Sequence, residues 1–440
     1  MNKGDVMELT RAYKFRIYPD TTRQAEIDER LILAQRFYNK ILEKSIASYQ
    51  NGKAKVSMVQ FNKFVKEIIQ EDKKYLKLYS QTRCEIEYRL LKAYQNFFRR
   101  IKEGNKKAGF PRFRSRDRYK TITYPQDNGS FAIERERKTD MLRVSRIGRM
   151  KIELHKSIEG TIKTLTIKKE AGDYYAIFTT TKETEQQKVE DTNPVGIDLG
   201  LNSFAAMSDG IKKEKPKFAM KKEKKLAHWQ RVIAKKDTVA KKQKRSKYTK
   251  NRAKAITHLQ EAWSEVTNQS NDFAHKLSDE LVNSGYTSFA VENLNIQNMA
   301  KNHNLAQSIQ NASWNRFVQM LSYKAESAGM KVIKVDPRNT SKTCNRCGNI
   351  QEIGWERTFI CEKCEMKMDR DINAAINILK RAREGYSRSN ASGDATSTLQ
   401  QGAQVASVNQ EHTLQHGVAG EAHTMDALGV QIGALRAPSL

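Results

Sequence analysis

The 440-residue sequence is long enough for two or three domains, each with a core of its own. Its 79 lysines and arginines against 50 acidic residues give a net charge of +29, which predicts a polyanionic partner, nucleic acid above all. No apolar run reaches the ~18–20 residues of a membrane-spanning helix, and the N-terminus lacks the apolar core of a signal peptide, so we expect a cytoplasmic protein without a membrane partner.

The first half of the chain predicts a β-rich domain into which helices are inserted. Residues 12–18 alternate apolar and basic side chains, which indicates a half-buried strand, and Pro19 and Asp20 end it. Apolar residues at helical spacing then predict helices from Asp20 to about Asn51, over 57–71 and over 78–103. Strand patterns return from 119 to 183, so the N-terminal strand is expected to join that later sheet.

Between helices and strands, residues 108–118 interleave arginines with Phe110 and Phe113. Such a loop can contact a nucleic-acid backbone and stack aromatic rings on bases. In the alternative interpretation, both phenylalanines are buried and the arginines are merely solvated.

Two apolar strands of the second half each carry one acid. In PVGIDLG, Val195 and Ile197 face one way, whereas Gly196 and Asp198 face the other. In SFAVENL the acid is Glu292, which can also be a strand-end carboxylate exposed to solvent. A carboxylate on an apolar strand is costly unless it binds a cation, so both are candidate metal ligands. A third buried strand is predicted at 331–336, covered by a helix over 314–328.

A strongly basic stretch separates these two acids. Residues 212–254 hold nineteen lysines and arginines against three acids, with a thin apolar seam that predicts a helical hairpin. Its charge favours a groove for a nucleic-acid duplex over a merely solvated face. Candidate contacts are Lys235, Lys242 and Arg245.

Four cysteines form two Cys-x-x-Cys pairs, Cys344 with Cys347 and Cys361 with Cys364. Four thiolates at this spacing predict one structural zinc ion in a zinc ribbon, and they leave no open position for catalysis.

Seven residues beyond the last cysteine, Asp371 precedes a helix whose buried stripe is predicted to be Ile372, Ala375, Ile376 and Leu379. Taken alone, Asp371 can simply be the N-cap of that helix. Three acids in this order, however, are typical of an RNase H-like nuclease. Such carboxylates repel one another unless divalent cations join them, and two magnesium ions ~3.5–4 Å apart can activate water against a phosphodiester.

The sequence resembles the TnpB (OrfB) family of transposon-encoded proteins, relatives of the compact type V CRISPR effectors. The matching segments are YKFRIYP, GFPRF, GIDLG, AVENLN, TSKTCNRCG with CEKC, and DRDINAAINIL, over roughly residues 11–383. The resemblance implies an RNA-guided DNA endonuclease. Its partners would be a guide RNA from the transposon end and double-stranded target DNA beside a short motif, and the protein would be a monomer.

The resemblance also implies roles and domains. Asp198, Glu292 and Asp371 would be the catalytic, magnesium-binding acids, with Asp371 preferred to Asp369 because of its place in the D-x-N-A-A motif. The fold would be a β-barrel-like wedge domain (1–20 and 105–192) with a helical, REC-like insertion (21–104). An α/β RuvC-like nuclease domain (193–340 and 366–385) would follow, interrupted by the zinc ribbon (341–365). Gln81, Arg83 and Arg112 are candidates for reading the target-adjacent motif.

Other functions remain open: a guided DNA-binding regulator without cleavage, a transposase that joins DNA ends with the same acids, a passive zinc-ribbon binder, or a CRISPR effector proper. Residues 386–440 carry two arginines against four acids and no sustained apolar period. We therefore expect them to form a disordered tail.

Overall fold

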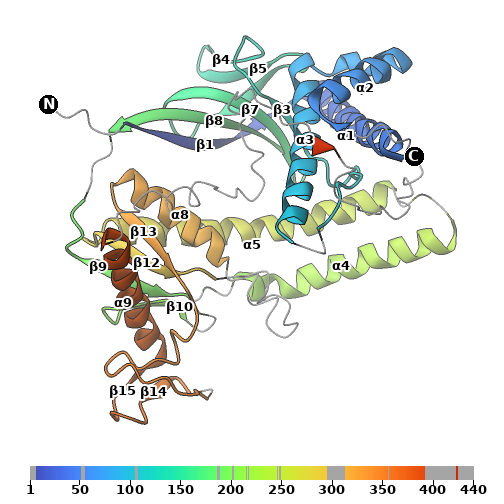
Figure 1. Cartoon of the computed structure of the whole chain (residues 1–440). Helices are drawn as coiled ribbons and strands as arrows, with labels where there is room; N and C mark the ends of the chain where they lie inside the picture. The colour runs from blue at the N-terminus through green and yellow to red at the C-terminus, as the bar shows by residue number, and fades with distance from the viewer. Residues whose placement is uncertain are drawn as a thin grey trace. The chain divides into compact units, whose positions relative to one another are not determined.

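The computed structural model describes residues 6–50, 55–104, 108–185, 189–200, 203–214, 216, 218–244, 246, 249–294, 313–354, 356–391 and 423–424 (Figure 1). The chain divides into two compact units, whose boundary in the sequence falls between Thr184 and Glu185. The unit that begins at Met7 is called the first unit, and the one that continues from Glu185 is called the second unit.

The first unit contains a seven-stranded sheet in the order β3-β7-β8-β1-β6-β5-β4. Its strands are β1 (Val6–Tyr18), β3 (Thr121–Tyr124), β4 (Phe131–Glu136), β5 (Thr139–Val144), β6 (Gly148–Glu153), β7 (Thr161–Glu170) and β8 (Asp173–Glu185). As predicted, the N-terminal strand joins the later sheet, and it lies between β8 and β6. The edges are β3 and β4, so the sheet is a half-barrel rather than a closed one.

Helices follow β1 in the sequence: α1 (Thr21–Gln50), α2 (Met58–Glu71), the 3-10 helix η1 (Lys73–Lys77) and α3 (Ser80–Lys102). Helix α1 belongs to two cores at once. Its first half places Ile27 and Leu31 against the sheet, and its second half places Phe37 and Ile41 among the side chains of α2 and α3. Because one continuous helix contributes side chains to both cores, it holds the sheet and the helical core together. The short strand β2 (Lys55–Val56) pairs with β16 (His423–Thr424).

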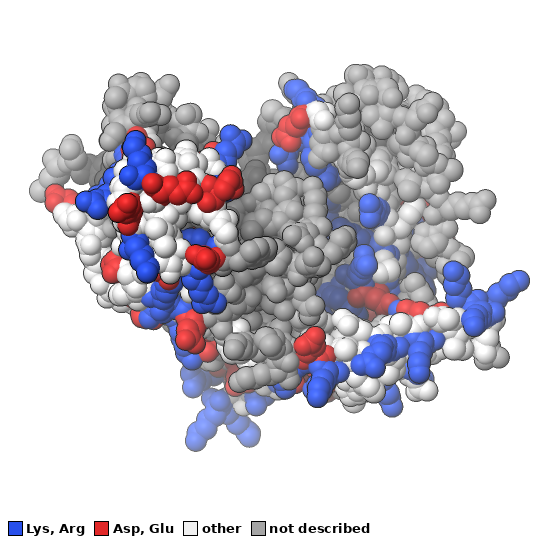
Figure 2. Space-filling model, turned by 90° about the horizontal axis from the view of Figure 1, so that it is seen from below, with Lys and Arg blue, Asp and Glu red and all other residues white. Residues whose placement is uncertain are grey.

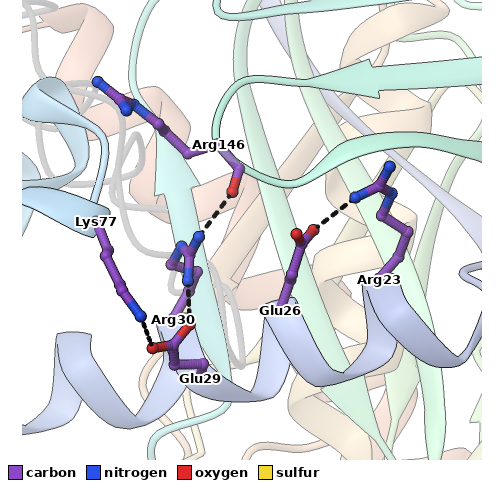
Figure 3. Close-up of polar contacts among 6 residues, drawn as sticks. All are labelled: Arg23, Glu26, Glu29, Arg30, Lys77 and Arg146. Atoms are coloured by element: carbon purple, nitrogen blue, oxygen red, sulfur yellow. Dashed lines mark hydrogen bonds and ion pairs between the residues drawn. The ribbon is translucent and has the colours of Figure 1, made fainter.

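Polar contacts fasten the first half of α1 (Figure 3). The guanidinium of Arg30, 12% exposed, donates to Glu29 at 2.5 Å and to the backbone oxygen of Arg146 in the β5–β6 turn at 3.1 Å. Lys77 of η1 also donates to Glu29 at 2.5 Å, and this hydrogen bond and the charge of Arg30 lower the pKa of that carboxyl. One turn earlier, Arg23 pairs with Glu26 at 3.1 Å. The helix is thereby tied to a turn of the sheet and to η1.

The second unit is built on a five-stranded sheet in the order β11-β10-β9-β12-β13. Strand β9 runs antiparallel to β10 and parallel to β12, which is itself parallel to β13. The strands are β9 (Pro194–Asp198), β10 (Ser203–Met207), β11 (Lys212–Glu214), β12 (Ser288–Glu292) and β13 (Lys331–Val335), and the helices are α4 (Phe218–Lys242), α5 (Lys250–Val282), α8 (Trp314–Ser327) and α9 (Arg370–Ala391).

Each face of this sheet has its own cover. Ile197 and Val291 pack with the C-terminal half of α5 and with α8, in the largest core of this unit. Ala290 packs on the other face against Ile378 and Ala382 of α9. Since side chains alternate along a strand, Asp198 and Glu292, one residue beyond Ile197 and Val291, lie on the α9 side.

Gly196 fixes the distance between α9 and the sheet. A Cβ built on this glycine would lie 2.1 Å from the backbone oxygen of Ala375 and 2.9 Å from Cβ of Leu379. The backbone of α9 therefore rests directly on β9, at the strand that ends in Asp198. No side chain larger than hydrogen fits at this contact.

The cysteine-rich segment lies between β13 and α9. It contains the antiparallel pair β14 (Thr358–Ile360) and β15 (Lys367–Asp369), and the last residue of β15 precedes α9 directly. The paired strands thus extend past residue 365, where the ribbon was expected to end.

Two expectations about α9 were wrong. Its most buried side chains are Ala374, Ala375, Ile378 and Ala382 together with Asn373 and Asn377, whereas Ile372, Ile376 and Leu379 are half-buried. The stripe is rotated because small residues let α9 approach β9 closely. The helix also continues to Ala391, so residues 386–391 are helical, and most of the remaining predicted tail lies outside the described residues.

A search of the described helices found no segment of the length and apolarity that crossing a bilayer requires.

We predict that Gly196→Ala destabilises the second unit. The added methyl group must push α9 away from β9, and overpacking of this kind costs about 1–3 kcal/mol or more. A calorimetric scan of the purified protein should show a lower melting temperature for the transition of this unit. Gly354→Ala is the matched control, because its Cβ would meet nothing within 4 Å. Equal melting temperatures for the two variants would contradict the close contact.

Candidate functional site

The three predicted acids lie on one side of the second-unit sheet. Asp198 and Glu292 end the adjacent parallel strands β9 and β12, whose preceding residues Ile197 and Val291 are paired. Asp371 lies in the first turn of α9, the helix that covers this side. Residues 94 and 79 positions apart in the sequence are therefore neighbours in the fold.

The electrostatics of Asp198 show how close these acids are. Burial and then the negative charges of Glu292 and Asp371 raise the pKa of Asp198 to about 8, against a smaller opposing effect of Arg370 and Lys212. Burial also raises the pKa of Glu292, although a hydrogen bond from Thr340 opposes the rise. Carboxylates whose ionisation is this unfavourable are typical ligands of a divalent cation, which supplies the missing positive charge.

Asp369, not Asp371, caps α9. Its Oδ1 accepts hydrogen bonds from the backbone N–H groups of Asp371 at 3.0 Å and Ile372 at 3.2 Å. Burial opposes ionisation of Asp369, but a hydrogen bond from Lys212 and these N–H groups lower its pKa overall. The capping role that the sequence left open for Asp371 is thus filled by its neighbour, and the Asp371 carboxylate is available for another role.

Lys212, at the start of the edge strand β11, reaches into the acid cluster. Its Nζ lies 2.5 Å from Oδ1 of Asp369 and 3.6 Å from Oδ2 of Asp371. The sequence placed this lysine only in the general basic stretch. No pattern in the sequence distinguishes it, because its closeness to these acids depends on the docking of α9, which lies more than 150 residues later in the chain.

The acids are neighbours but not a ready-made ligand set. Among the described residues, only the four cysteines form a group of at least three potential ligands whose atoms all lie within 4.8 Å of one another. Joint coordination of a cation by Asp198, Glu292 and Asp371 therefore requires side-chain rotations. The donor types fit magnesium, which prefers carboxylate oxygen.

The cysteine cluster fits zinc closely. Sγ of Cys344 lies 3.7 Å from that of Cys364, and Sγ of Cys347 lies 3.5 Å from that of Cys361. Tetrahedral zinc with ~2.3 Å Zn–S bonds separates its sulfurs by about 3.8 Å. Burial opposes ionisation of Cys361, but backbone N–H groups and neighbouring thiols outweigh it and lower its pKa to about 6, which favours the thiolate. Cys344, Cys361 and Phe359 form a small buried core around the cluster.

A polar network fastens this cluster to α9. The Oδ1 atom of Asn373 accepts from the backbone N–H of Asn345 at 3.0 Å, and its Nδ2 donates to the backbone oxygen of Thr343 at 2.8 Å. One turn later, Asn377 donates to the backbone oxygens of Thr340 and Thr343 at 2.9 and 2.6 Å. Neither asparagine was predicted from the sequence, although their i, i+4 spacing inside DINAAINIL is a visible signal.

In the first unit, residues 108–115 have no regular secondary structure and a turn follows at 116–118, while Phe110 and Phe113 pack against the helical core. Phe110 is half-buried and packs edge-on against the rings of Tyr94 and Phe97. Asn39 of α1 exchanges hydrogen bonds with the backbone of Arg114 at 2.8 and 3.0 Å.

The side chains of this segment alternate, and the arginines at 112, 114, 116 and 118 are all exposed. Arg112, Arg116 and Arg118 form no ion pair with any residue that the structure describes. The four exposed arginines at positions 112, 114, 116 and 118 are called the arginine row. Phe110 and Phe113 are thus half-buried against the helical core, the arginine row is exposed, and the contact of this segment with nucleic acid stays a prediction.

The other candidate contacts differ among themselves. Arg83 is half-buried and donates to the backbone oxygen of Leu78 at 2.6 Å, so its guanidinium is engaged within the helical core. Gln81 donates to exposed Gln126 at 3.1 Å. Arg245 lies outside the described residues.

Helices α4 and α5 form the predicted hairpin. Trp229 stacks on His258 with ring centroids 4.6 Å apart, and Arg252 pairs with Asp237 at 2.5 Å. Figure 2 shows lysine and arginine side chains gathered along α4. Exposed Lys235 and Lys242 have no ion-pair partner within the described part of the chain, so this face attracts polyanions.

Three family models match successive parts of the chain. They are a "Helix-turn-helix domain" of OrfB (residues 7–54), the OrfB "Probable transposase" model (177–303) and the "Cas12f1-like, TNB domain" model (314–378). Together they span more than half of the sequence. Over the described residues of the first match, the structure has a strand and a single long helix, so the name of that model does not describe the local fold.

Among curated proteins, the chain is 28% identical to a candidate RNA-guided DNA endonuclease of Streptomyces pristinaespiralis, over 85% of this chain and 90% of that protein. It is 26% identical to the candidate RNA-guided DNA endonuclease InsQ of Escherichia coli, over 85% and 92%. Among solved structures, a Cas12f1 complex with guide RNA and target DNA matches 84% of this chain and 99% of that chain, with a TM-score of 0.52 and 15% identity, which shows a shared fold.

We predict that the purified protein contains about one zinc ion per chain and that Cys361→Ser loses it, because three thiolates no longer close the tetrahedron. Elemental analysis measures the zinc, and hydrogen exchange should show faster exchange at the start of α9, which the cluster holds through Asn373. Cys84→Ser is the control, since this fifth cysteine is exposed on the first unit. Full zinc content in Cys361→Ser would contradict the assignment.

Proposed function

We propose that this chain, which belongs to the TnpB (OrfB) family of relatives of the type V CRISPR effectors, is an RNA-guided DNA endonuclease. The observation that carries the proposal is the convergence of Asp198, Glu292 and Asp371 on one side of the second-unit sheet. Relatives of similar length with the corresponding names support it.

The second unit is proposed to be an RNase H-like (RuvC) nuclease domain. The strand order β11-β10-β9-β12-β13, with β10 antiparallel, supports this, as does the position of two acids at the ends of neighbouring parallel strands. In this division, residues 193–340 and 366–385 form the nuclease domain around a zinc ribbon. Residues 1–20 and 105–192 form the wedge domain, and 21–104 its helical insertion.

Asp198, Glu292 and Asp371 would hold two magnesium ions, which activate a water and stabilise the leaving oxygen of a phosphodiester. The chain contributes the arrangement around them. Burial destabilises the ionised form of Asp198, so the site favours binding of a cation. Asp369 caps the N-terminus of α9 and so determines where this helix begins. The close contact at Gly196 determines the distance between α9 and β9.

Zinc bound by the four cysteines would act structurally, because a closed Cys₄ site offers no position to water. It would hold the segment between β13 and α9 in a defined shape. Asn373 and Asn377 hydrogen-bond the backbone of that segment and so hold it against α9, the helix that carries Asp371.

The partners are proposed to be a guide RNA from the transposon end and a target duplex beside a short motif. The arginine row and the basic face of α4 would hold nucleic-acid backbones by charge, while base pairing with the guide reads the sequence. Gln81 and Arg112 stay candidates for contacts near the motif. Arg83 is a weaker one, because its guanidinium already bonds the protein backbone.

The "Probable transposase" name of one matching model favours a second candidate function, the joining of transposon ends by the same acids. The two functions differ in one product. An assay with transposon ends, target plasmid and magnesium, run with and without the guide RNA, separates them. Strand-transfer products without RNA indicate a transposase, and cut matched plasmid only with RNA indicates the endonuclease.

We predict that Asp198→Asn, Glu292→Gln and Asp371→Asn each lose cleavage of matched plasmid while guided DNA binding stays near wild type. Each change removes a charged cation ligand but keeps the shape of the side chain. The measurement is cleavage by the assembled ribonucleoprotein over a library of flanking motifs, with binding followed by gel shift.

Asp369→Asn is the matched control for Asp371→Asn. Asparagine caps a helix as well as aspartate does, so this variant keeps α9 and should keep measurable cleavage. If Asp369→Asn abolished cutting and Asp371→Asn did not, Asp369 and not Asp371 would be the third cation ligand.

The arginine row is predicted to contact phosphates. The double variant Arg112→Ala with Arg116→Ala should weaken guide-RNA binding and reduce the slope of log K against log salt by about 0.7–0.9 per arginine. Filter binding at several salt concentrations measures the slope. Arg99→Ala is the control, since this exposed arginine pairs with Glu103 at 3.0 Å. An unchanged slope in the double variant would remove the row from the interface.

A further inference from the structure

The segment between β13 and the first cysteine contributes one buried hydroxyl to the acid cluster. Thr340 is 2% exposed, and its Oγ1 donates a hydrogen bond to Oε1 of Glu292. The same hydroxyl lies 3.1 Å from the backbone oxygen of Pro337. Oε2 of Glu292 accepts no hydrogen bond from any described residue, so one carboxylate oxygen is fixed and the other is left available.

Helix α9 holds Thr340 in turn. Asn377, only 6% exposed, donates from Nδ2 to the backbone oxygen of Thr340 at 2.9 Å and to that of Thr343 at 2.6 Å. This helix also carries Asp371 in its first turn. The contact between Thr340 and Glu292 therefore connects the end of β12 to the element that supplies another of the three acids.

We propose that Thr340 is a positioning residue of the nuclease site: its hydroxyl orients the Glu292 carboxylate so that Oε2 is presented to a divalent cation. The inference rests on the proposed function, because it takes Glu292 as a cation ligand. A ligand carboxylate that is hydrogen-bonded from a second residue loses less freedom when it binds. Loss of such partners typically costs about 10–100-fold in metal affinity or activity.

A purely structural role for Thr340 has a different signature. If the hydroxyl served only to satisfy the loop through Pro337, its removal would change thermal stability alone. Thr343 provides the comparison within the same segment, since its hydroxyl donates to the backbone oxygen of Asn339 at 2.7 Å and forms no hydrogen bond with an acid among the described residues. Replacing either threonine by valine removes one hydroxyl and keeps the branched shape.

The experiment compares Thr340→Val, Thr340→Ser and Thr343→Val in the ribonucleoprotein across a magnesium series. Thr340→Val should reduce cleavage about 10–100-fold at low magnesium and recover in part at high magnesium. Thr340→Ser, which keeps the hydroxyl, should approach wild type, as should Thr343→Val. Guided DNA binding should be equal in all of them.

A second readout does not depend on cutting. Manganese binding by the full-length protein, followed by electron paramagnetic resonance, should be weaker in Thr340→Val and restored in Thr340→Ser. If the wild type fails to cut matched DNA, the proposed function fails, while the manganese comparison still tests Thr340. Should Thr340→Val not fold, Thr340→Ala removes the hydroxyl without placing a second methyl against Glu292.

The proposal is overturned if Thr340→Val matches wild type in both the magnesium series and manganese affinity. It is equally overturned if Thr343→Val shows the same loss, or if Thr340→Ser is no better than Thr340→Val.

Discussion

The nearness of α9 to β9 is the constraint on which the second unit depends. At Gly196 the helix backbone occupies the space that a side chain would need, so helix and strand are in direct contact. Ala375 of α9 lies at this contact, and Ala382 packs on the same side of the sheet against Ala290. Because Asp198 ends the same strand and Asp371 begins the same helix, the packing distance also sets the distance between two acids.

Burial and mutual repulsion make the acid cluster unfavourable for the protein alone. Burial and the charges of Glu292 and Asp371 raise the pKa of Asp198, and polar partners lie around the cluster. Lys212 faces Asp371, while Thr340 binds Glu292. Stability lost at such a site must be regained in well-packed parts of the same unit, such as the core that α5 and α8 form on the opposite face of the sheet.

Much of the fold could be predicted because the spacing of apolar residues and the residues that end helices and strands, such as Pro19, were clear in the sequence. The strand before Pro19, the three helices and the strands around Asp198 and Glu292 follow from apolar spacing and are present. The α9 stripe was misplaced because periodicity assumes that large apolar residues face the core, whereas this interface selects alanine and buried asparagine. Lys212 lies beside Asp371 because α9, more than 150 residues later in the chain, docks near the β10–β11 hairpin, and such long-range docking leaves no local signal in the sequence.

The site could be predicted only in part for the same reason. The spacing of the two Cys-x-x-Cys pairs predicts a metal site, and the four sulfurs lie within 4.8 Å of one another. The acids were singled out by their apolar surroundings, and their catalytic role stays a prediction. Aromatic residues among arginines suggested base stacking at Phe110, which the structure shows half-buried against Tyr94 and Phe97, and the stacking stays a prediction.

The position of α9 in the chain has a consequence for biosynthesis. The strand that ends in Asp198 leaves the ribosome early, whereas the α9 residues that rest on Gly196, Ala375 and Leu379, are translated much later. Until α9 docks, the backbone of β9 at Gly196 lacks the contact with this helix, and Asp371 is not yet beside the other two acids. On a nascent chain, Asp198 and Glu292 can therefore come together with Asp371 only after α9 has been translated.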